Sequence, residues 1–457
     1  MLWDLAIPIN YPATYWPLFD QPYNMDYESF RKRYPRFEYR SFSWHISGLT
    51  LHTVFNFSLP ADFAFNHEVI FTFPTPPIST DIDENLIFHL GLSEMFSYWK
   101  AACSPQVIIT AGGLDEQQTA FWHKLFIKGM GEYFYRNKID FTVPRFLTLT
   151  SAVKEPVLKV AGSELSGSQV LVPVGGGKDS IVTLELLKNN FNITPFVVNS
   201  VPVINSVLQK SGVSSPITVE RVFDPQLFKL NGEGFLNGHI PVSAFYAFSS
   251  ILGASVLGIK YIAFSNESSS NEGNTTFQGH EINHQYSKTA EFESDLTDYL
   301  KYINTPVSCF SFLRPLSELQ ITSVFSNYPH YFPIFTSCNN NFKMDPEKHP
   351  QGSLWCKKCP KCVSTALLLA SFLGKDRVSE IMGAFPPDLP ENRQILNELL
   401  GLTPVKPFEC VLSRAEAQAA LEKITTGSLE KFSREMSVIR NSTNLPENFA
   451  GILTKAL

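Results

Sequence analysis

The stretch LVPVGGGKDSIVTLELL, residues 171–187, decides the fold of this chain. An apolar run ends at Val174, three consecutive glycines follow, and a segment that we expect to be helical opens at Asp179 and Ser180. Consecutive glycines let the backbone approach a ligand very closely, because no Cβ obstructs it. The free N–H groups and the dipole at a helix start attract anions. The stretch therefore predicts a strand, a tight turn and a helix that together hold a phosphate or pyrophosphate.

The positions of the glycines exclude two common phosphate-binding motifs. A Walker A loop would need glycine in place of Val172 and a hydroxyl residue in place of Asp179. The dinucleotide-binding fingerprint would need glycine in place of Ser180. The remaining pattern, Gly-Gly-Gly-x-Asp-Ser from Gly175, resembles the pyrophosphate loop of the ATP pyrophosphatase superfamily. The alternative is a glycine-rich turn that binds no ligand.

This resemblance implies that ATP binds and is cleaved between its α and β phosphates, with adenylation of an oxygen of a second substrate. It also implies Mg²⁺, which neutralises phosphate charge. Asp179 is the carboxylate expected to coordinate the metal or order the phosphates, Lys178 is expected to contact phosphate, and adenine is expected beside Asn199. The residues expected to bind the nucleotide are Gly175, Gly176, Gly177, Lys178, Asp179, Ser180 and Asn199.

Short apolar runs alternate with helical segments around this stretch. An apolar helix is expected at 242–257, and the expected strands are 169–174, 194–199, 217–223, 261–265 and 307–312. Such alternation predicts an α/β fold with a doubly wound, mostly parallel sheet, in which ligands bind at the carboxyl ends of the strands. The superfamily resemblance makes this a fold of the adenine nucleotide alpha-hydrolase (PP-loop) type, over residues 163–375.

The flanking parts of the chain have different patterns. Residues 1–162 predict an N-terminal α+β domain with an accessory or substrate-binding role. Within it, HISGLTLHTVFNFSL (45–59) and HEVIFTFP (67–74) alternate as strands of an antiparallel sheet with one buried face do. Helices are expected at 83–101 and 114–137. Residues 376–457 predict a helical C-terminal region, in which Ser413-Arg-Ala-Glu416 forms a capping box.

Polar side chains crowd residues 265–288, SNESSSNEGNTTFQGHEINHQYSK, after the expected fourth strand. A solvated surface loop has this composition, but the carboxyl edge of the sheet is also where a substrate would bind. This segment resembles the ATP-dependent glutamate epimerase family of peptidoglycan precursor synthesis, as do VGGGKDSIVTLELL, LNGHIPVSAF and WCKKCPKC. The resemblance covers residues 40–375. The resemblance implies a small-molecule substrate, UDP-N-acetylmuramoyl-L-alanyl-L-glutamate. It implies inversion of the terminal glutamate, with release of AMP and diphosphate.

The implied chemistry needs two proton-transfer groups, one on each face of the glutamate α-carbon. The α-proton beside a free carboxylate is barely acidic, whereas adenylation turns the carboxylate into an electron sink, so that a modest base suffices. Histidines titrate near neutral pH, which makes His239, His280 and His284 the first candidates. Glu267 and Lys288 are the second candidates. Each of these side chains also fits a structural role.

The cysteines indicate a metal site. Cys356, Cys359 and Cys362 form C-x-x-C-x-x-C, and Cys338 lies eighteen residues before the first of them. Four thiolates make a closed tetrahedral zinc site, and a cluster in a chain without a secretion signal favours metal over disulfides. A similar cluster in 7-cyano-7-deazaguanine synthases binds structural zinc. His349 is an alternative fourth ligand, and buried reduced cysteines are the alternative to zinc.

Composition narrows the class of partner and the compartment. The net charge of −6 lacks the basic excess of nucleic-acid-binding domains, so no nucleic acid is expected. The first residues lack the basic and apolar regions of a signal peptide. The longest apolar stretches, 248–259 and 363–373, fall short of the ~20 residues that a membrane span needs. We therefore expect a cytoplasmic protein without a membrane segment, whose oligomeric state is open.

Two other interpretations fit the same motifs. The first is another adenylating enzyme with a PP-loop, similar to a 7-cyano-7-deazaguanine synthase or to a tRNA thiolase. The cysteine cluster favours it, while the acidic net charge speaks against a tRNA substrate. The second is a nucleotide-binding module that zinc stabilises and that catalyses nothing.

Overall fold

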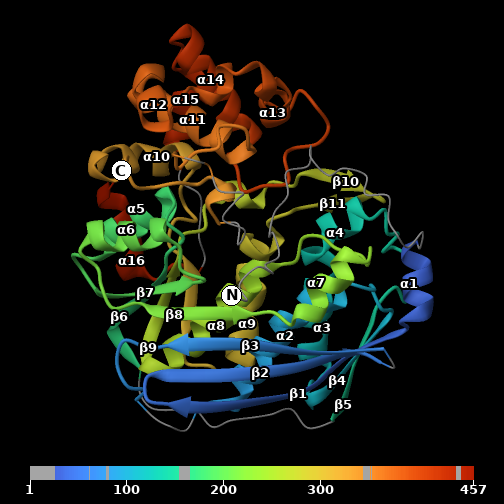
Figure 1. The fold of residues 1–457 in the computed structure, drawn as a ribbon. Coiled ribbons are helices and arrows are strands. Elements are labelled where there is room, and N and C mark those ends of the chain that lie inside the picture. Colours follow the sequence, from blue (N-terminus) through green and yellow to red (C-terminus); the bar gives the residue numbers. More distant parts are fainter. Residues whose placement is uncertain are drawn as a thin grey trace.

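The computed structural model describes residues 26–60, 62–78, 82–153, 165–342, 350, 352–438 and 444–456. One ten-stranded sheet organises them, in the order β12-β9-β6-β7-β8-β3-β2-β1-β4-β5 (Figure 1). These strands are, in that order, Ser308–Ser311, Ile259–Phe264, Ser166–Pro173, Asn192–Val198, Ile217–Val222, Phe63–Thr72, Thr50–Leu59, Arg36–Ser47, Gln106–Gly113 and Thr148–Val153.

The sheet is mostly parallel. Every pair from β12 to β8 is parallel, as are β1-β4 and β4-β5, while β1-β2, β2-β3 and β3-β8 are antiparallel. The strands and the mixed α/β class expected from the sequence are confirmed. The pair β3-β8 joins the N-terminal strands to the parallel strands, so one sheet contains strands from both sides of the expected boundary between the first two units. The division of the chain into three units stays a prediction.

Helices cover both faces of the parallel strands. In β6, Val170 and Val172 belong to one core and Leu171 to another, and neighbouring Ile262 and Ala263 of β9 divide in the same way. Because successive side chains of a strand point to opposite faces, the two cores lie on the two sides of the sheet. One side carries α2 (Glu84–Trp99), α3 (Glu116–Gly129) and α8 (Val242–Leu257), with α9 (Ala290–Tyr302). The other carries α5 (Lys178–Leu187) and α6 (Pro202–Ser211), with α10 (Glu318–Ser326).

The N-terminal strands show the expected alternation. Buried and partly exposed residues alternate along β2, and β2 pairs with β3 in antiparallel register from Thr50↔Thr72 to Leu59↔Phe63. Strand β1 begins at Arg36, nine residues before the first strand expected from the sequence at residue 45. Strands β4 and β5 were not predicted. The helix expected at 114–137 is two helices, α3 and α4 (Gly131–Arg136). Helix α1 (Tyr27–Arg33) precedes β1, and helix α7 (Pro225–Gly232) follows β8.

The C-terminal region is helical, as expected. Figure 1 shows its helices at the end of the molecule opposite β1, β2 and β3. The group begins before the expected residue 376, with α11 (Pro360–Leu373), and continues with α12 (Lys375–Met382), α13 (Arg393–Leu399), α14 (Arg414–Thr426) and α15 (Glu430–Ser437). The capping box at Ser413 and Glu416 opens α14. The last helix, α16 (Glu447–Ala456), returns to the sheet, where Phe449 stacks on Phe191 at 4.6 Å between ring centroids.

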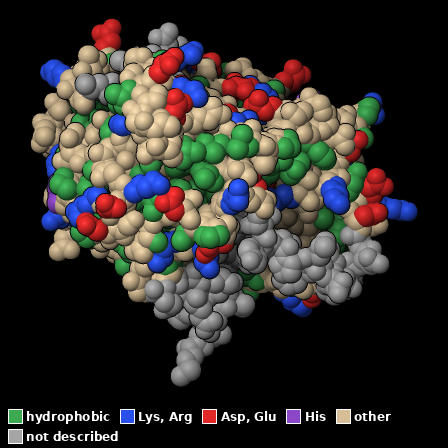
Figure 2. Space-filling model, turned by 90° about the horizontal axis from the view of Figure 1, so that it is seen from above, with side chains coloured by type: hydrophobic (Ala, Val, Ile, Leu, Met, Phe, Trp, Pro, Cys, Tyr) green, Lys and Arg blue, Asp and Glu red, His purple; other side chains and the backbone are tan. Residues whose placement is uncertain are grey.

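The surface of the described residues is mixed in charge. Figure 2 shows basic and acidic side chains interspersed over the upper face. Among the helices described, we find none with the length and apolarity that crossing a bilayer would require.

Candidate active site

A pocket of about 490 Å³ opens where the parallel strands end. Its wall includes Val174, Asn199 and Ser265, which follow strands β6, β7 and β9. Ligands of doubly wound sheets bind at this edge. Lys361 and Cys410 line the same pocket from the C-terminal region. The pocket is therefore built from the parallel sheet and from the helical region together.

The glycine loop forms the strand–turn–helix that the sequence predicts. Gly176 has φ +78°, and a Cβ there would lie 2.9 Å from Val203 Cγ1, so only glycine fits without strain. Gly177 is the N-cap of α5 and makes no side-chain cap, which leaves the first N–H groups of the helix for a ligand. The Ser180 hydroxyl donates to the Gly177 carbonyl at 3.0 Å. The loop has the geometry of an anion site.

Six of the seven residues predicted to bind nucleotide line the pocket: Gly175, Gly177, Lys178, Asp179, Ser180 and Asn199. Asn199 has φ +47°, and its Oδ1 accepts a hydrogen bond from the backbone N–H of Arg221 at 3.0 Å. This bond ties down the turn after β7. The Lys178 side chain was expected at a phosphate. It lies buried between Asp179 and Glu318 and forms an ion pair with each.

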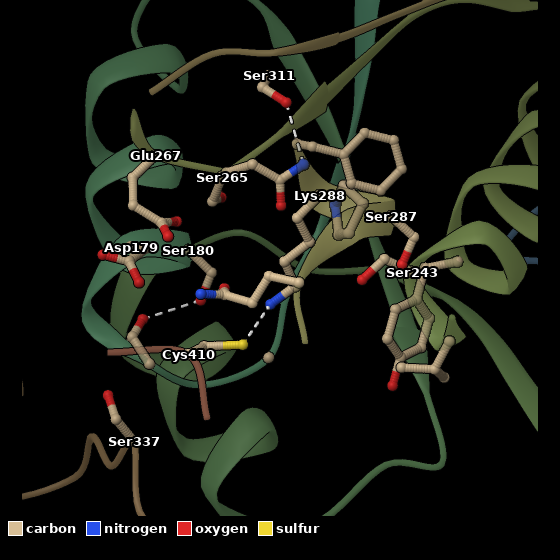
Figure 3. Close-up of a pocket in the computed structure, with 18 of the residues that line it drawn as sticks. Asp179, Ser180, Ser243, Ser265, Glu267, Ser287, Lys288, Ser311, Ser337 and Cys410 are labelled. Atoms are coloured by element: carbon tan, nitrogen blue, oxygen red, sulfur yellow. Dashed lines mark hydrogen bonds between the residues drawn. The ribbon is translucent and has the colours of Figure 1, made fainter. Parts of the chain in front are cut away.

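Three carboxylates converge beside the glycine loop. One oxygen each of Asp179, Glu267 and Glu318 lies within 4.8 Å of the others. Figure 3 shows the Asp179 and Glu267 carboxylates close together. Burial, followed by the charge of Asp179, raises the pKa of Glu267. Burial raises the pKa of Glu318 to about 8, against the opposing effect of Lys178. A divalent cation would relieve this crowding of negative charge, and carboxylate oxygens are the ligands that Mg²⁺ prefers. The residues present fit the expected metal.

Glu318 was not predicted from the sequence. It is the first residue of α10, after Ser317, whose side chain and that of Gln320 form a capping box. The capping box is a readable signal for a helix start, but nothing local marks Glu318 as facing the glycine loop 140 residues earlier. Its backbone N–H donates to Glu416 Oε1 at 2.6 Å, which links it to the first turn of α14.

Two of the predicted histidines meet at a buried carboxylate. His284 Nδ1 is hydrogen-bonded to Glu132 of α4, His239 Nδ1 lies 3.8 Å from the same carboxylate, and the two rings are 4.1 Å apart. Burial opposes charge on His284, but Glu132 outweighs it and raises the pKa of His284 to about 9. Burial and the charge of His284 lower the pKa of His239 to about 3. At neutral pH the pair therefore combines an imidazolium with a neutral imidazole.

The remaining predicted proton-transfer residues are divided by the structure. Lys288 lies in η2 (Tyr286–Lys288) and lines the pocket, and Glu267 joins the carboxylate group described above. His280 lies on β11 (His280–Ile282), which pairs with β10 (Thr275–Phe277). Its side chain is exposed and packs beside Phe141 at 5.4 Å, outside the residues that line the pocket. The structure thus brings His239, His284, Glu267 and Lys288 together, and leaves His280 apart.

Cys410 is a pocket residue that sequence reasoning missed. It lies in the segment between α13 and α14, and Lys288 Nζ donates a hydrogen bond to its sulfur at 3.1 Å (Figure 3). Burial alone would raise the pKa of Cys410, but Lys288, Lys361 and His284 together lower it well below the usual value. The three positive charges therefore favour the thiolate form of this side chain. No sequence signal marks it, because a single cysteine carries no spacing pattern.

The cysteine cluster assembles as predicted. The sulfurs of all four residues lie within 4.8 Å of one another, with Sγ–Sγ distances of 3.5 Å (Cys359–Cys362), 3.8 Å (Cys356–Cys362) and 3.9 Å (Cys338–Cys359). Sulfurs of a tetrahedral zinc site are about 3.8 Å apart, given a Zn–S bond of ~2.3 Å. The four thiols fit zinc. His349, the alternative ligand, lies outside the described residues.

The cluster stands directly behind the glycine loop. Thr336 N–H donates to the Gly176 carbonyl at 3.3 Å, and a Cβ on Gly177 would lie 3.3 Å from Ser337 Oγ. Cys338 follows these residues in the chain, and Cys359 is the N-cap of α11. A metal at the four sulfurs would thus fix the segment that supports the anion site.

Comparison with known proteins gives one consistent family. Two family models match: the MurL N-terminal domain over residues 28–312 and the MurL C-terminal domain over residues 334–450. Three curated relatives carry the name UDP-N-acetyl-alpha-D-muramoyl-L-alanyl-L-glutamate epimerase. The one from Salinispora tropica is 34% identical over 403 residues, 85% of each chain. Those from Micromonospora sp. and Xanthomonas oryzae pv. oryzae are 38% and 34% identical over 71% of each chain. No solved structure matches.

Proposed function

Because this chain belongs to the MurL family of epimerases, and is therefore an isomerase, we propose that it inverts the terminal glutamate of UDP-N-acetylmuramoyl-L-alanyl-L-glutamate from L to D. The reaction serves peptidoglycan precursor synthesis. It proceeds through adenylation of the glutamate α-carboxylate by ATP and releases AMP and diphosphate. The observation that carries the adenylation step is the glycine loop beside three converging carboxylates.

Activation of the carboxylate explains why an epimerase would use ATP. Removal of the α-proton next to a carboxylate would add a second negative charge to the α-carbon and carboxylate of the glutamate. A neutral acyl-phosphate ester accepts that charge as an enolate, so a side chain of moderate basicity can remove the proton. Hydrolysis of the adenylate after inversion then makes the cycle irreversible. Neither a flavin nor pyridoxal phosphate is required for this sequence of steps.

The residues of the pocket divide between the two halves of the reaction. The backbone N–H groups from Gly177 onward hold phosphate oxygens at the start of α5, in a fold of the PP-loop type. Asp179, Glu267 and Glu318 would hold Mg²⁺, which would neutralise phosphate charge during transfer. Lys178 balances the carboxylates and keeps them in place.

The second half of the reaction, proton transfer, uses other residues that line the pocket, among them His239 and His284. His284 carries a proton at neutral pH and His239 does not, and because the two rings lie side by side, both face the same side of a substrate in the pocket. Glu132 holds both rings in position. The structural zinc that we propose at the four cysteines lies outside this chemistry and supports the loop.

The test is to incubate the purified protein with the UDP-muramoyl dipeptide, ATP and Mg²⁺ in D₂O. We expect AMP, diphosphate and a D-glutamate residue that carries one α-deuteron. Asp179→Asn should abolish AMP formation, whereas Asp298→Asn, on the exposed face of α9, should not. Deuterium at the α-carbon without any AMP would overturn the adenylation step. AMP formation with a nitrile precursor or a tRNA in place of the dipeptide would instead favour the other adenylating enzymes.

A further inference from the structure

The C-terminal helical region contributes a thiol to the pocket, and a lysine ammonium donates a hydrogen bond to its sulfur. We propose that Cys410 is one of the two catalytic proton-transfer groups, exchanging the α-proton of the activated glutamate through its sulfur. This inference rests on the proposed epimerase function and adds a residue to it. The argument is geometric: the sulfur lines the pocket that the glycine loop and the three carboxylates define.

Its surroundings set Cys410 apart from the other six cysteines, and the structure describes all seven. Four of them form the cluster behind the glycine loop. Cys103 is buried in the core, where its sulfur accepts from Arg31 Nη1 at 3.5 Å and burial raises the pKa of its thiol to about 11. Cys309, on β12, lines the pocket as well, but burial and the charge of Glu293 raise the pKa of its thiol. Cys410 alone among the seven is hydrogen-bonded to a lysine ammonium.

The surroundings of Cys410 supply what a proton-transfer thiolate needs. The residue is partly exposed to the pocket, so a substrate carbon can approach it. Lys288 holds the negative charge at 3.1 Å, and Lys361 and His284 add positive charge. Glu267, one of the three carboxylates, also interacts with Cys410 (Figure 3). The sulfur therefore lies near the end of the pocket where the acyl-adenylate would form.

The step balances without an added oxidant or reductant. The α C–H bond breaks, an S–H bond forms at Cys410, and the electron pair stays on the enolate of the acyl-adenylate. A second acid on the opposite face then gives a proton, which forms the new C–H bond and inverts the centre. His284 and Lys288 both interact with the Cys410 sulfur, so they lie on its own side of the α-carbon and hold its charge there. The proton on the opposite face comes from water in the pocket, which acts as the second acid. Exchange with solvent restores the starting protonation states.

The decisive experiment separates activation from inversion in Cys410→Ser. The variant is incubated with the UDP-muramoyl dipeptide, ATP and Mg²⁺ in D₂O, and AMP, D-glutamate and α-deuterium are measured separately. We expect AMP formation to persist, because the nucleotide site is intact and water hydrolyses the adenylate. D-glutamate should fall at least ~100-fold, the usual contribution of a proton-transfer group. The variant would then consume ATP and return L-glutamate.

Cys103→Ser is the matched control, because it removes a buried thiol that does not line the pocket. A thermal melt of each variant establishes that it is folded. Inversion by Cys410→Ser within about threefold of the control would overturn the inference, since proton-transfer groups contribute far more than this. Loss of AMP formation in a folded Cys410→Ser would overturn it too, because the thiol would then act in activation. Absence of AMP and of inversion in the unaltered protein would instead overturn the proposed function.

Discussion

Glu132→Gln tests the electrostatics of the histidine pair most directly. The carboxylate is buried, is hydrogen-bonded to His284 Nδ1, and accepts from Arg136 Nε at 2.5 Å. Glutamine keeps the size of the side chain and removes its charge. The positive charge of His284 then loses its main neighbouring anion and keeps only the weaker interaction with Cys410, so burial makes the imidazolium unfavourable.

The magnitude follows from the pKa of His284. Glu132 is the main cause that raises this pKa from 6.5 to about 9. One pKa unit corresponds to ~1.4 kcal/mol, so the rise stabilises the folded protein by about 3 kcal/mol when His284 is charged. Because the folded pKa is the higher one, this contribution is fully present below pH 6.5. It is lost as the pH rises through about 9.

Urea unfolding at pH 6.5 and pH 9.5 measures the effect. We expect Glu132→Gln to lower the free energy of unfolding by about 3 kcal/mol more at pH 6.5 than at pH 9.5. Glu68→Gln is the matched control, because Glu68 pairs with His52 at 2.8 Å through side chains that are 38% and 26% exposed. An exposed pair of the same residue types should contribute less than ~1 kcal/mol. The same loss of stability at both pH values for Glu132→Gln would refute the assignment of charge to His284.

Three further predictions concern other parts of the site. Gly176→Ala puts a Cβ 2.9 Å from Val203 in a left-handed backbone, so AMP formation should fall at least ~10-fold, and an unchanged rate would contradict the close packing of the loop. Cys356→Ser should reduce bound zinc, measured by atomic absorption, from about one atom per chain to near zero; retained zinc would exclude this thiol as a ligand. Lys288→Met should slow alkylation of Cys410 by iodoacetamide at pH 7 by at least ~10-fold, and an unchanged alkylation rate would show that another group maintains the thiolate.

The parts of the site that could be predicted are those encoded locally. Gly175 to Ser180 specify a strand end, a turn and a helix start within six residues, and the structure confirms each of them. The three-residue steps between Cys356, Cys359 and Cys362 bring the thiols into one cluster in the same way. Such motifs carry their geometry in their spacing, so one sequence is enough to recognise them.

The residues that sequence reasoning missed act across the fold. Glu132 reaches His284 over 152 positions, and Cys410 reaches Lys288 over 122. Neither partner has a local pattern, and their contact depends on how the polar loop and the C-terminal region pack. His280 shows the opposite case: it stands only four residues before His284, yet the short hairpin of β10 and β11 turns it outward. His280 was therefore predicted at the site because it is near His284 in the sequence, whereas Glu132, Glu318 and Cys410 were missed because their partners are distant in the sequence.

The polar loop and the C-terminal region form one structure at the pocket. The Asn274 side chain donates to the Pro407 carbonyl at 2.6 Å, the Lys406 N–H donates to the Asn274 carbonyl at 2.8 Å, and Lys406 Nζ pairs with Glu272 at 2.8 Å. Lys406 is only 1% exposed, so this ion pair is a buried anchor rather than a surface contact.

These anchors explain why a polar, serine-rich and asparagine-rich segment is ordered at the sheet edge. Its side chains hold the segment that carries Cys410, and Lys288 at its end then meets the sulfur. The family match to residue 450 agrees with a C-terminal region that belongs to the site. A chain that ended at residue 375 would keep the glycine loop, Asp179 and Glu267, but it would lose Cys410 and the Glu416 carboxylate that accepts the N–H of Glu318. On this proposal the helical region supplies the sulfur for inversion, and it supports Glu318 beside the glycine loop, although every residue of that loop precedes it in the sequence.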